Sequence, residues 1–190
     1  MANIEPALRQ TLINEGGYSN DPQDRGGETF MGIARNMHPE WSGWPIIDKI
    51  VDKKNLKAFD PRLMPYVASF YKATYWDKVC GDMMADQNVA NELFDTAVNC
   101  GIGFESKNIQ IALNLLNRNG KSWPDIVVDG AIGPKTLATL NTCLIKDARV
   151  FYNLLNALQG KRYIEICIGN PTQEIYLRGW LERVDILKKS

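Results

Sequence analysis

The chain has 190 residues, and its 22 basic and 22 acidic side chains leave no formal net charge. This length suits one compact domain or two small ones, and a composition of 45% apolar and 23% charged residues is that of a globular protein, which excludes disordered and collagen-like chains. The zero balance argues against a general nucleic-acid-binding protein, because such proteins are usually strongly basic.

The first predicted elements are a helix and a small β-hairpin. Asn3 is placed to cap a helix whose apolar residues recur at helical spacing up to Leu12. Gly16-Gly17 is expected to end this helix, because glycine adopts the left-handed cap conformation without strain. Turn-forming residues fill 18–27, and residues 28–33 are compatible with an extended return strand.

The rest of the chain is predicted to be helical with irregular connections. Residues 37–63 hold three prolines and two tryptophans, which indicates an irregular segment with room for one short helix. Further on, apolar periodicity combines with prolines or capping residues at helix starts. These signals predict a helix after Pro65, one from Asp86 to Gly101, one over 106–117, one starting at Pro134, a long periodic stretch over 145–168, and a last helix after 170–173. The predicted fold class is therefore mainly α.

Histidine and cysteine usage narrows the possible chemistry. The single histidine, His38, excludes a two-histidine HExxH protease, and no GxSxG, P-loop or GxGxxG motif occurs. The four cysteines are 20, 43 and 24 residues apart, so they form no CxxC pair and are expected to be reduced, mostly buried thiols. We predict no metal site and no cofactor, which leaves carboxylates to carry any catalysis.

Charge is distributed unevenly along the chain. Residues 1–104 hold ten basic and fourteen acidic side chains, whereas residues 105–190 hold twelve basic and eight acidic ones. One interpretation is a division between chemistry and docking on a polyanionic surface, and the other is chance variation in a small count. The sequence leaves both interpretations open.

Glu15, Asp24 and Thr29 are the candidate catalytic residues. A carboxylate at the end of the first helix lies at the negative end of the helix dipole, which raises its pKa, as a general acid near neutral pH requires. Asp24 and Thr29 follow in the turn and on the return strand, where they can face Glu15. Two carboxylates flanking a glycosidic bond can hydrolyse it, with Thr29 holding the water. The alternative is that Asp24 is a turn residue, which an aspartate before Arg25-Gly26-Gly27 is more often than a catalyst.

Several motifs resemble known families. EGGY at 15–18, DRGGET at 24–29, Tyr75-Trp76 and FDTAVNCG at 94–101 resemble glycoside hydrolase family 108, the phage and prophage lysozyme-like muramidases. From about residue 105 the chain resembles the peptidoglycan-binding domain that accompanies this family, through Gln110, Asn114, VDGAIGPKT at 128–136 and GWLER at 179–183. The resemblance covers nearly the whole chain.

The resemblance implies a mainly α, lysozyme-like fold with a small β-hairpin after the first helix. Residues 1–104 would form the glycoside hydrolase region and residues 105–190 a helical peptidoglycan-binding region, sharing one compact body. The implied reaction is cleavage of the β-1,4 bond between N-acetylmuramic acid and N-acetylglucosamine. The family's catalytic glutamate falls on Glu15, and analogy with phage lysozymes of another family adds Asp24 and Thr29 and favours inversion over retention, which the separation of the two carboxyls would decide.

Four further residues are assigned to substrate binding. Gly27 belongs to the DRGGET motif, and Tyr18 and Trp76 are expected to stack on sugar rings, because aromatic faces suit the apolar side of a pyranose. Asn99 could hydrogen-bond an N-acetyl group. Asp95 and Asn99 share one helix face, however, so the alternative is a local pair that fixes the helix end.

The function expected from these observations is that of an endolysin-type peptidoglycan hydrolase. The alternative is a non-catalytic peptidoglycan-binding or secretion-accessory protein, since some relatives are described as secretion activators; the solitary histidine disfavours a peptidase or amidase. The expected partner is bacterial peptidoglycan, without nucleic acid or stable membrane insertion, and the protein is expected to be a monomer. Residues 1–10 lack an apolar signal core, so we expect synthesis in the cytoplasm without a signal peptide and action on the cell wall or periplasm after release, through a holin or a dedicated export route.

Overall fold

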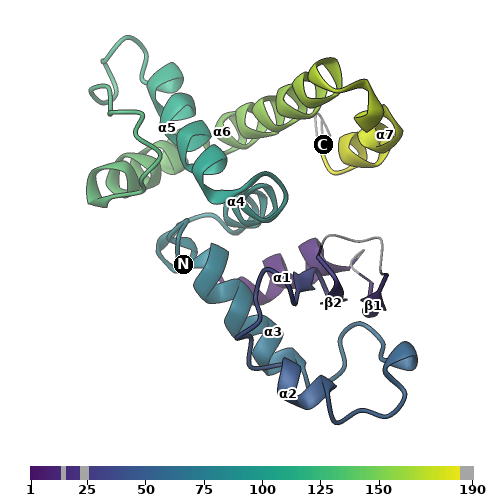
Figure 1. Cartoon of the computed structure of the whole chain (residues 1–190). Helices are drawn as coiled ribbons and strands as arrows, with labels where there is room; N and C mark the ends of the chain where they lie inside the picture. Colours follow the sequence, from purple (N-terminus) through teal and green to yellow (C-terminus); the bar gives the residue numbers. More distant parts are fainter. Residues whose placement is uncertain (14–15, 22–25, 185–190) are drawn as a thin grey trace. The chain divides into compact units, whose positions relative to one another are not determined.

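The computed structural model describes residues 1–13, 16–21 and 26–184 (Figure 1). Backbone contacts group the chain into two compact units. The hairpin unit comprises Leu8–Thr74, and the helical unit comprises Met1–Ala7 together with Tyr75–Ser190. The boundaries between the units fall inside helix α1 (Ile4–Leu12) and inside the π-helical turn η2 (Lys72–Trp76).

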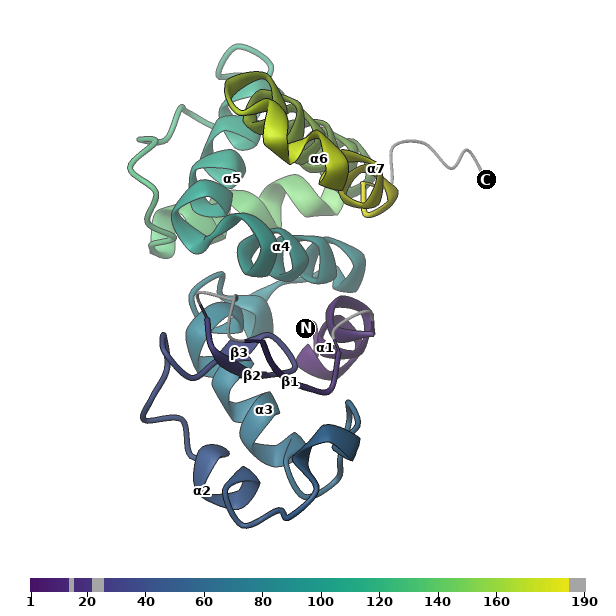
Figure 2. The same ribbon diagram turned by 45° about the vertical axis from the view of Figure 1, so that its right-hand side comes forward.

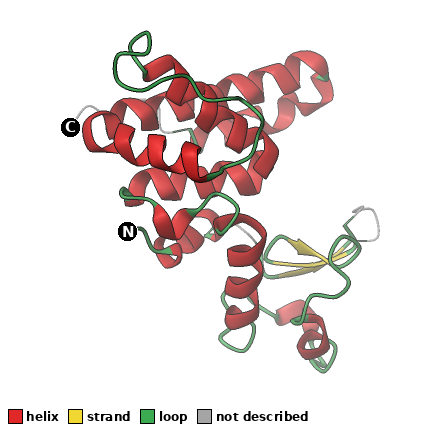
Figure 3. Ribbon diagram, turned by 90° about the vertical axis from the view of Figure 1, so that its left-hand side faces the viewer, coloured by secondary structure: helices red, strands yellow, loops and turns green. Residues whose placement is uncertain are grey.

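The hairpin unit contains a three-stranded antiparallel sheet, drawn in yellow in Figure 3. Its strands, in the order in which they pair, are β1 (Tyr18–Asn20), β2 (Glu28–Phe30) and β3 (Ile33–Ala34). The predicted hairpin is thus confirmed, but the return strand expected over 28–33 is two strands. The chain reverses at Met31 and Gly32, which have φ angles of 45° and 78°.

An aromatic core supports this sheet. The helical pieces of the hairpin unit after the sheet are α2 (Trp44–Ile47), η1 (Lys53–Asn55) and α3 (Met64–Tyr71). The rings of Phe30 and Trp41 stack with centroids 6.3 Å apart, and the rings of Trp41 and Trp44 meet edge to face at 5.0 Å. The Tyr71 hydroxyl donates a hydrogen bond of 2.8 Å to the carbonyl oxygen of Met31, which ties α3 to the turn between β2 and β3.

Three long helices build the helical unit. Its elements after η2 are η3 (Gly81–Met83), α4 (Gln87–Cys100), α5 (Ile102–Leu116), α6 (Pro134–Gly169), η4 (Pro171–Gln173) and α7 (Glu174–Glu182). Helix α6 contacts α4, α5 and α7, and Figure 2 shows α7 running beside it. The two segments expected from Pro134 and over 145–168 are one helix of 36 residues, with non-helical backbone at Asp147. None of the described helices is both long enough and apolar enough to cross a membrane.

Helix starts follow the capping signals in the sequence. The Asn3 side chain accepts a hydrogen bond from the Glu5 N–H at 2.9 Å, at the start of α1. The Asp86 carboxylate accepts one from the Val89 N–H at 3.0 Å, at the start of α4. Pro134 is the first residue of α6. At Asn3 and Asp86 a side-chain acceptor satisfies an N–H that has no partner within the helix, whereas Pro134 has no N–H that would need one.

The loop between α5 and α6 is fastened to α5 by two amide side chains. Gln110 donates to the Asp129 carboxylate at 2.7 Å and accepts from the Gly130 N–H at 2.8 Å. Asn114 makes two hydrogen bonds with the backbone of Ile126, at 2.8 and 2.9 Å. These residues, which carry the resemblance to a peptidoglycan-binding domain, therefore have a structural role in holding the loop.

Candidate functional site

The sheet of the hairpin unit brings part of the predicted site together. Tyr18 lies on β1, Thr29 lies on β2 opposite Ser19, and Gly27 immediately precedes β2. The predicted catalytic carboxylates, Glu15 and Asp24, lie outside the described residues. The predicted inversion depends on the distance between these two carboxyls, so it stays a prediction.

Thr29 is held by the backbone at Gly27. Its hydroxyl donates a hydrogen bond of 3.1 Å to the Gly27 carbonyl oxygen. Gly27 has a φ of +66°, and a Cβ at this position would lie 2.8 Å from the side-chain nitrogen of Asn36. The positive φ favours glycine at this position, and a Cβ there would have to displace the Asn36 side chain. Because the Thr29 proton is already directed at a carbonyl, the hydroxyl oxygen retains lone pairs that can accept a hydrogen bond from a water.

A cluster of charged side chains surrounds Glu28, the neighbour of Thr29. Its carboxylate accepts hydrogen bonds from the Tyr18 hydroxyl at 2.6 Å and from the Lys53 ammonium at 3.1 Å, and it pairs with the Arg35 guanidinium. The Asp48 carboxylate pairs with the same two cations, at 2.7 Å to Arg35 and 3.2 Å to Lys53. We call these five residues the Glu28 cluster. Tyr18 lies on β1 and Glu28 on β2, and Arg35 directly follows β3, whereas Asp48 directly follows α2 and Lys53 begins η1. The cluster therefore links the sheet to α2 and η1 within the hairpin unit.

The Glu28 cluster holds its central carboxyl in the ionised form. Burial by itself raises the pKa of Glu28, but the hydrogen bonds from Tyr18 and Lys53 and the positive charge of Arg35 together outweigh burial, so the pKa is lowered. For Tyr18, burial and then the hydrogen bond to the Glu28 carboxylate raise the pKa of the phenol. Glu28 is therefore a poor general acid, and Tyr18 keeps its proton.

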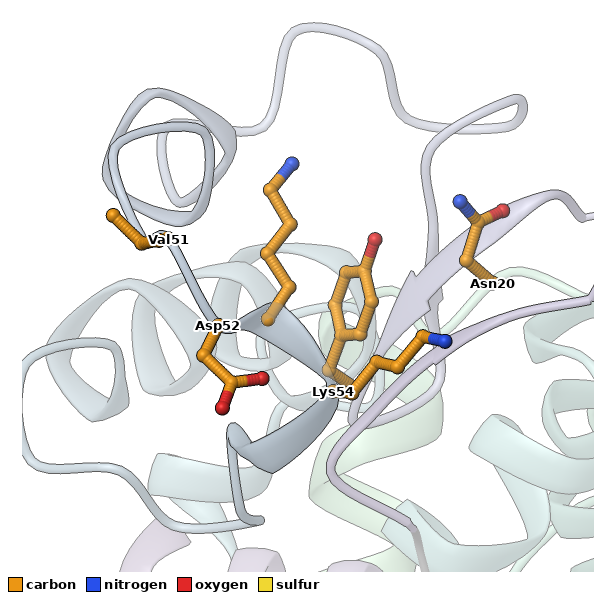
Figure 4. A pocket seen from close by; sticks show the side chains of 6 residues that line it. Asn20, Val51, Asp52 and Lys54 are labelled. Carbon is orange, nitrogen blue, oxygen red and sulfur yellow. The ribbon is translucent and has the colours of Figure 1, made fainter.

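A pocket of about 560 Å³ opens beside Tyr18 (Figure 4). Its lining residues come from β1 and from the segment leading into and through η1: Tyr18, Asn20, Val51, Asp52, Lys53 and Lys54. Figure 4 shows the Lys54 side chain extending toward the side of the pocket where Asn20 lies. Ligand pockets typically enclose roughly 300–1,000 Å³, so this one has the size to hold sugar units.

Trp76 is a core residue of the helical unit. Its side chain is fully buried, its indole N–H donates to the Asp82 carboxylate at 2.7 Å, and its ring packs edge to face on Phe94 at 5.9 Å. A Cβ at position 81 would lie 2.2 Å from the ring, so Gly81 makes room for it. Because protein atoms cover both faces of the ring, we do not propose Trp76 as a platform for sugars.

Asn99 is exposed near the end of α4 and is part of a local network. Its amide nitrogen donates to the Asp95 carbonyl oxygen at 2.8 Å and to the Asp95 carboxylate at 3.0 Å. Its amide oxygen accepts from the Arg183 guanidinium at 2.8 Å. The local pairing that the sequence offered as the alternative is therefore present, and these hydrogen bonds orient the Asn99 amide.

Sequence reasoning does not predict the Glu28 cluster. Glu28 itself lies within the DRGGET motif, so the motif offered a signal for it. Asp48 and Lys53 lie in a segment expected to be irregular, 20 and 25 positions beyond Glu28, and no local pattern indicates that they meet it. The sheet and the aromatic core bring them together.

Comparison with family models and known structures identifies the two parts of the chain. Residues 8–101 match the family model described as Glycosyl hydrolase 108, and residues 106–185 match one described as Predicted Peptidoglycan domain. The structure of SagA from Brucella abortus is similar, with 28% sequence identity and a TM-score of 0.60, and the match covers 94% of this chain and 87% of that one. A comparison with curated proteins yields no significant match. Residues 8–101 therefore form a glycosyl hydrolase 108 domain, and residues 106–185 form a C-terminal peptidoglycan-binding domain.

Proposed function

We propose that this glycoside hydrolase is a peptidoglycan muramidase, which cleaves the β-1,4 bond between N-acetylmuramic acid and N-acetylglucosamine. The observation that carries the proposal is the presence of a hydrolase match and a peptidoglycan-domain match in one chain. A glycosidase attached to such a domain has its substrate bonds in the polymer that the domain binds.

In the proposed mechanism Glu15 is the general acid. It donates its proton to the glycosidic oxygen as the bond from the sugar C1 to that oxygen breaks. Asp24 accepts a proton from the water that forms the new bond to C1 on the opposite face, which inverts the configuration there. The described geometry supports a water-holding role for Thr29, because its hydroxyl proton is used on Gly27 and its oxygen can accept from the water.

The environment of Glu28 makes it unsuited to be the general acid, which supports assigning that role to Glu15. A general acid must hold a proton near neutral pH, and the cations around Glu28 oppose protonation. Tyr18, which hydrogen-bonds Glu28 and lines the 560 Å³ pocket, is the substrate-binding residue best supported by its position. Gly27 contributes through its backbone, by placing the carbonyl that orients Thr29.

The biological role that we propose is that of an endolysin, a monomer made in the cytoplasm that reaches the cell wall after release. A secretion-accessory protein that binds peptidoglycan without cleaving it is the second candidate, favoured by the peptidoglycan-domain match considered alone. Catalytic turnover separates the two. Cell fractionation before and after induced lysis tests the route to the wall.

Digestion of purified peptidoglycan tests the proposed reaction. The full chain is incubated with sacculi, and the soluble products are reduced with borohydride and identified by mass spectrometry. We expect new reducing ends on N-acetylmuramic acid. New reducing ends on N-acetylglucosamine would show a different glycosidase, and no new ends together with retention on sacculi would favour the binding protein.

A further inference from the structure

The pocket beside Tyr18 lies entirely within the hairpin unit, and we call it the hairpin pocket (Figure 4). Its residues differ in exposure: Tyr18 and Lys53 are half-buried, whereas Asn20, Asp52 and Lys54 are exposed. The half-buried pair belongs to the Glu28 cluster, and the exposed residues lie outside it. The pocket therefore has an inner side, built from the cluster, and an outer side, which faces solvent.

The groups on the inner side already have partners within the protein. The Lys53 ammonium is shared by two carboxylates, at 3.1 Å from Glu28 and 3.2 Å from Asp48. The Tyr18 hydroxyl donates to Glu28, and the Asn20 side chain forms a hydrogen bond with the same hydroxyl. Two carboxylates and two cations balance within the Glu28 cluster, so the described residues of the inner side leave no unpaired charge for a ligand.

Lys54, on the outer side, is different. Figure 4 shows its side chain extending toward Asn20 and away from the Asp52 carboxylate. Asp52 itself accepts a hydrogen bond from the Asn55 amide at 2.6 Å. Within the described part of the chain, Lys54 has no hydrogen bond or ion pair through its side chain, so the ammonium keeps its three N–H donors for a ligand. The hairpin pocket therefore presents an uncommitted positive charge on the side where an amide side chain lies.

A carboxylate is the ligand group that suits this side of the pocket. An ammonium binds a carboxylate through charge-assisted hydrogen bonds, and an amide N–H can donate to the same group. In peptidoglycan, N-acetylmuramic acid carries a lactyl group, and through it a stem peptide, and these substituents present carboxylates, whereas N-acetylglucosamine is uncharged. A volume of about 560 Å³ lies within the range for whole ligands, so the pocket has room for a sugar with part of its substituent.

We propose that the hairpin pocket binds the N-acetylmuramoyl unit of a glycan strand, and that Lys54 recognises a carboxylate of the lactyl or peptide substituent. The proposal rests on the proposed function, since peptidoglycan is the polymer that presents this unit. Lys54 is then a residue that determines specificity, because it distinguishes a peptidoglycan strand from an uncharged strand of N-acetylglucosamine. The Glu28 cluster supports this site by holding Tyr18 on the inner side of the pocket.

The charge-removing variant Lys54→Met tests the site, with Lys57→Met as the matched control. Both lysines are exposed in the same segment, but Lys57 does not line the pocket. Binding of muramyl dipeptide, which has one free carboxylate, is measured on the full chain by titration with NMR detection of backbone amides. We expect Lys54→Met to weaken binding about fivefold, as for an exposed ion pair of favourable geometry, and to remove most of its salt dependence. Lys57→Met should bind as the wild type does, and both variants should keep the wild-type Tm.

A ligand without a carboxylate and the position of the NMR changes make the test decisive. Tri-N-acetylchitotriose should not distinguish Lys54→Met from the wild type. With muramyl dipeptide we expect the wild-type amides of residues 18–20 and 51–54 to shift. The proposal is overturned by shifts confined to other residues or by none at all, by equal affinity of Lys54→Met and wild type for muramyl dipeptide, or by an equal loss in the two lysine variants.

Two further measurements identify the carboxylate and separate this proposal from the proposed reaction. Binding of free N-acetylmuramic acid that depends on Lys54 would assign the lactyl carboxylate, and binding of muramyl dipeptide alone would assign the peptide carboxylate; either result supports the site. Release of new reducing ends from sacculi reports on the reaction, so binding that depends on Lys54 without cleavage would reject the muramidase and keep the site.

Discussion

Two glutamates, one in each unit, lie in opposite electrostatic environments. Glu28 in the hairpin unit is surrounded by Arg35, Lys53 and the Tyr18 hydroxyl. Glu105 on α5 is 1% exposed, and its Oε1 atom has no hydrogen-bond partner among the described residues. Burial first, and then the negative charges of Glu92 and Asp95, raise the pKa of Glu105 well above its ordinary value.

The difference shows that partners can outweigh burial: hydrogen bonds and cations reverse the effect of burial on the pKa of Glu28, whereas burial is the largest cause of the raised pKa of Glu105. Both side chains are largely buried, and burial acts on both in the same direction, yet their pKa values move in opposite directions. A raised pKa is characteristic of a general acid, but Glu105 is buried between helices and inaccessible to a substrate. Glu28 lies beside Thr29, among the predicted catalytic residues, but it is held ionised. Neither glutamate combines a raised pKa with a position that a substrate can reach, so we keep Glu15 as the proposed general acid.

The largest expected effect is that of Glu15→Gln. We expect peptidoglycan cleavage to fall by about 100- to 10,000-fold, because the variant lacks the proposed proton donor while keeping its shape. Release of reducing ends from sacculi gives the rate, and circular dichroism verifies the fold. Glu40→Gln, an exposed glutamate outside the site, is the control and should retain full activity. If Glu15→Gln keeps more than roughly a tenth of the activity, the acid is another group.

Glu28→Gln should destabilise the hairpin unit. It leaves Arg35 and Lys53 with one carboxylate instead of two, and we expect a loss of about 1–3 kcal/mol, measured by urea denaturation. Because the pKa of Glu28 is lowered on folding, its stabilisation is present above about pH 4.5 and is lost as pH falls through the lower folded-state value. The variant should therefore lose less stability than the wild type on acidification. Glu165→Gln, in an exposed pair with Lys161, should change little.

Gly27→Ala tests the backbone that leads into β2, and Gly120→Ala is its matched control. Both glycines have positive φ, +66° and +77°, so both variants incur the left-handed strain of about 1–2 kcal/mol. Only Gly27 also meets the Asn36 side chain, whereas a Cβ at Gly120 has no described atom within 4 Å. We expect Gly27→Ala to cost about 1 kcal/mol more than Gly120→Ala. Equal losses in denaturation would mean that Asn36 moves aside.

The smallest expected effect, of opposite sign, is that of Glu105→Gln. The raised pKa means that folding favours the protonated form, so the contribution of Glu105 to stability is fully present below about pH 4.5 and is lost as pH rises through its folded-state pKa. Glutamine cannot ionise, so at pH 7 the variant should gain about 1 kcal/mol, which raises Tm by roughly 2–4 °C. Thermal unfolding between pH 4 and pH 8 should show a flatter profile. A lower Tm at pH 7 would mean that the carboxylate has partners that stabilise it.

The sequence by itself determined the local features of the fold. Asn3, Asp86 and Pro134 mark helix starts, and the structure places α1, α4 and α6 there, because a cap depends on groups only a few residues apart. The hairpin after the first helix was predictable for the same reason, because the turn-forming residues that indicate it are close together in the sequence. The split at Met31 was not predicted, since positive φ at methionine is uncommon and arises from the packing of the turn, which Tyr71 ties to α3.

Only the tertiary structure decided which side chains meet. Trp76 stands beside Asp77 and Lys78 in the sequence, which suggests exposure, yet Gly81 and Phe94 enclose it. The partners of Glu28 have no local signature either. Capping and turns depend on bonds between near neighbours, whereas burial and ion pairing depend on packing between residues tens of positions apart, which no short pattern encodes.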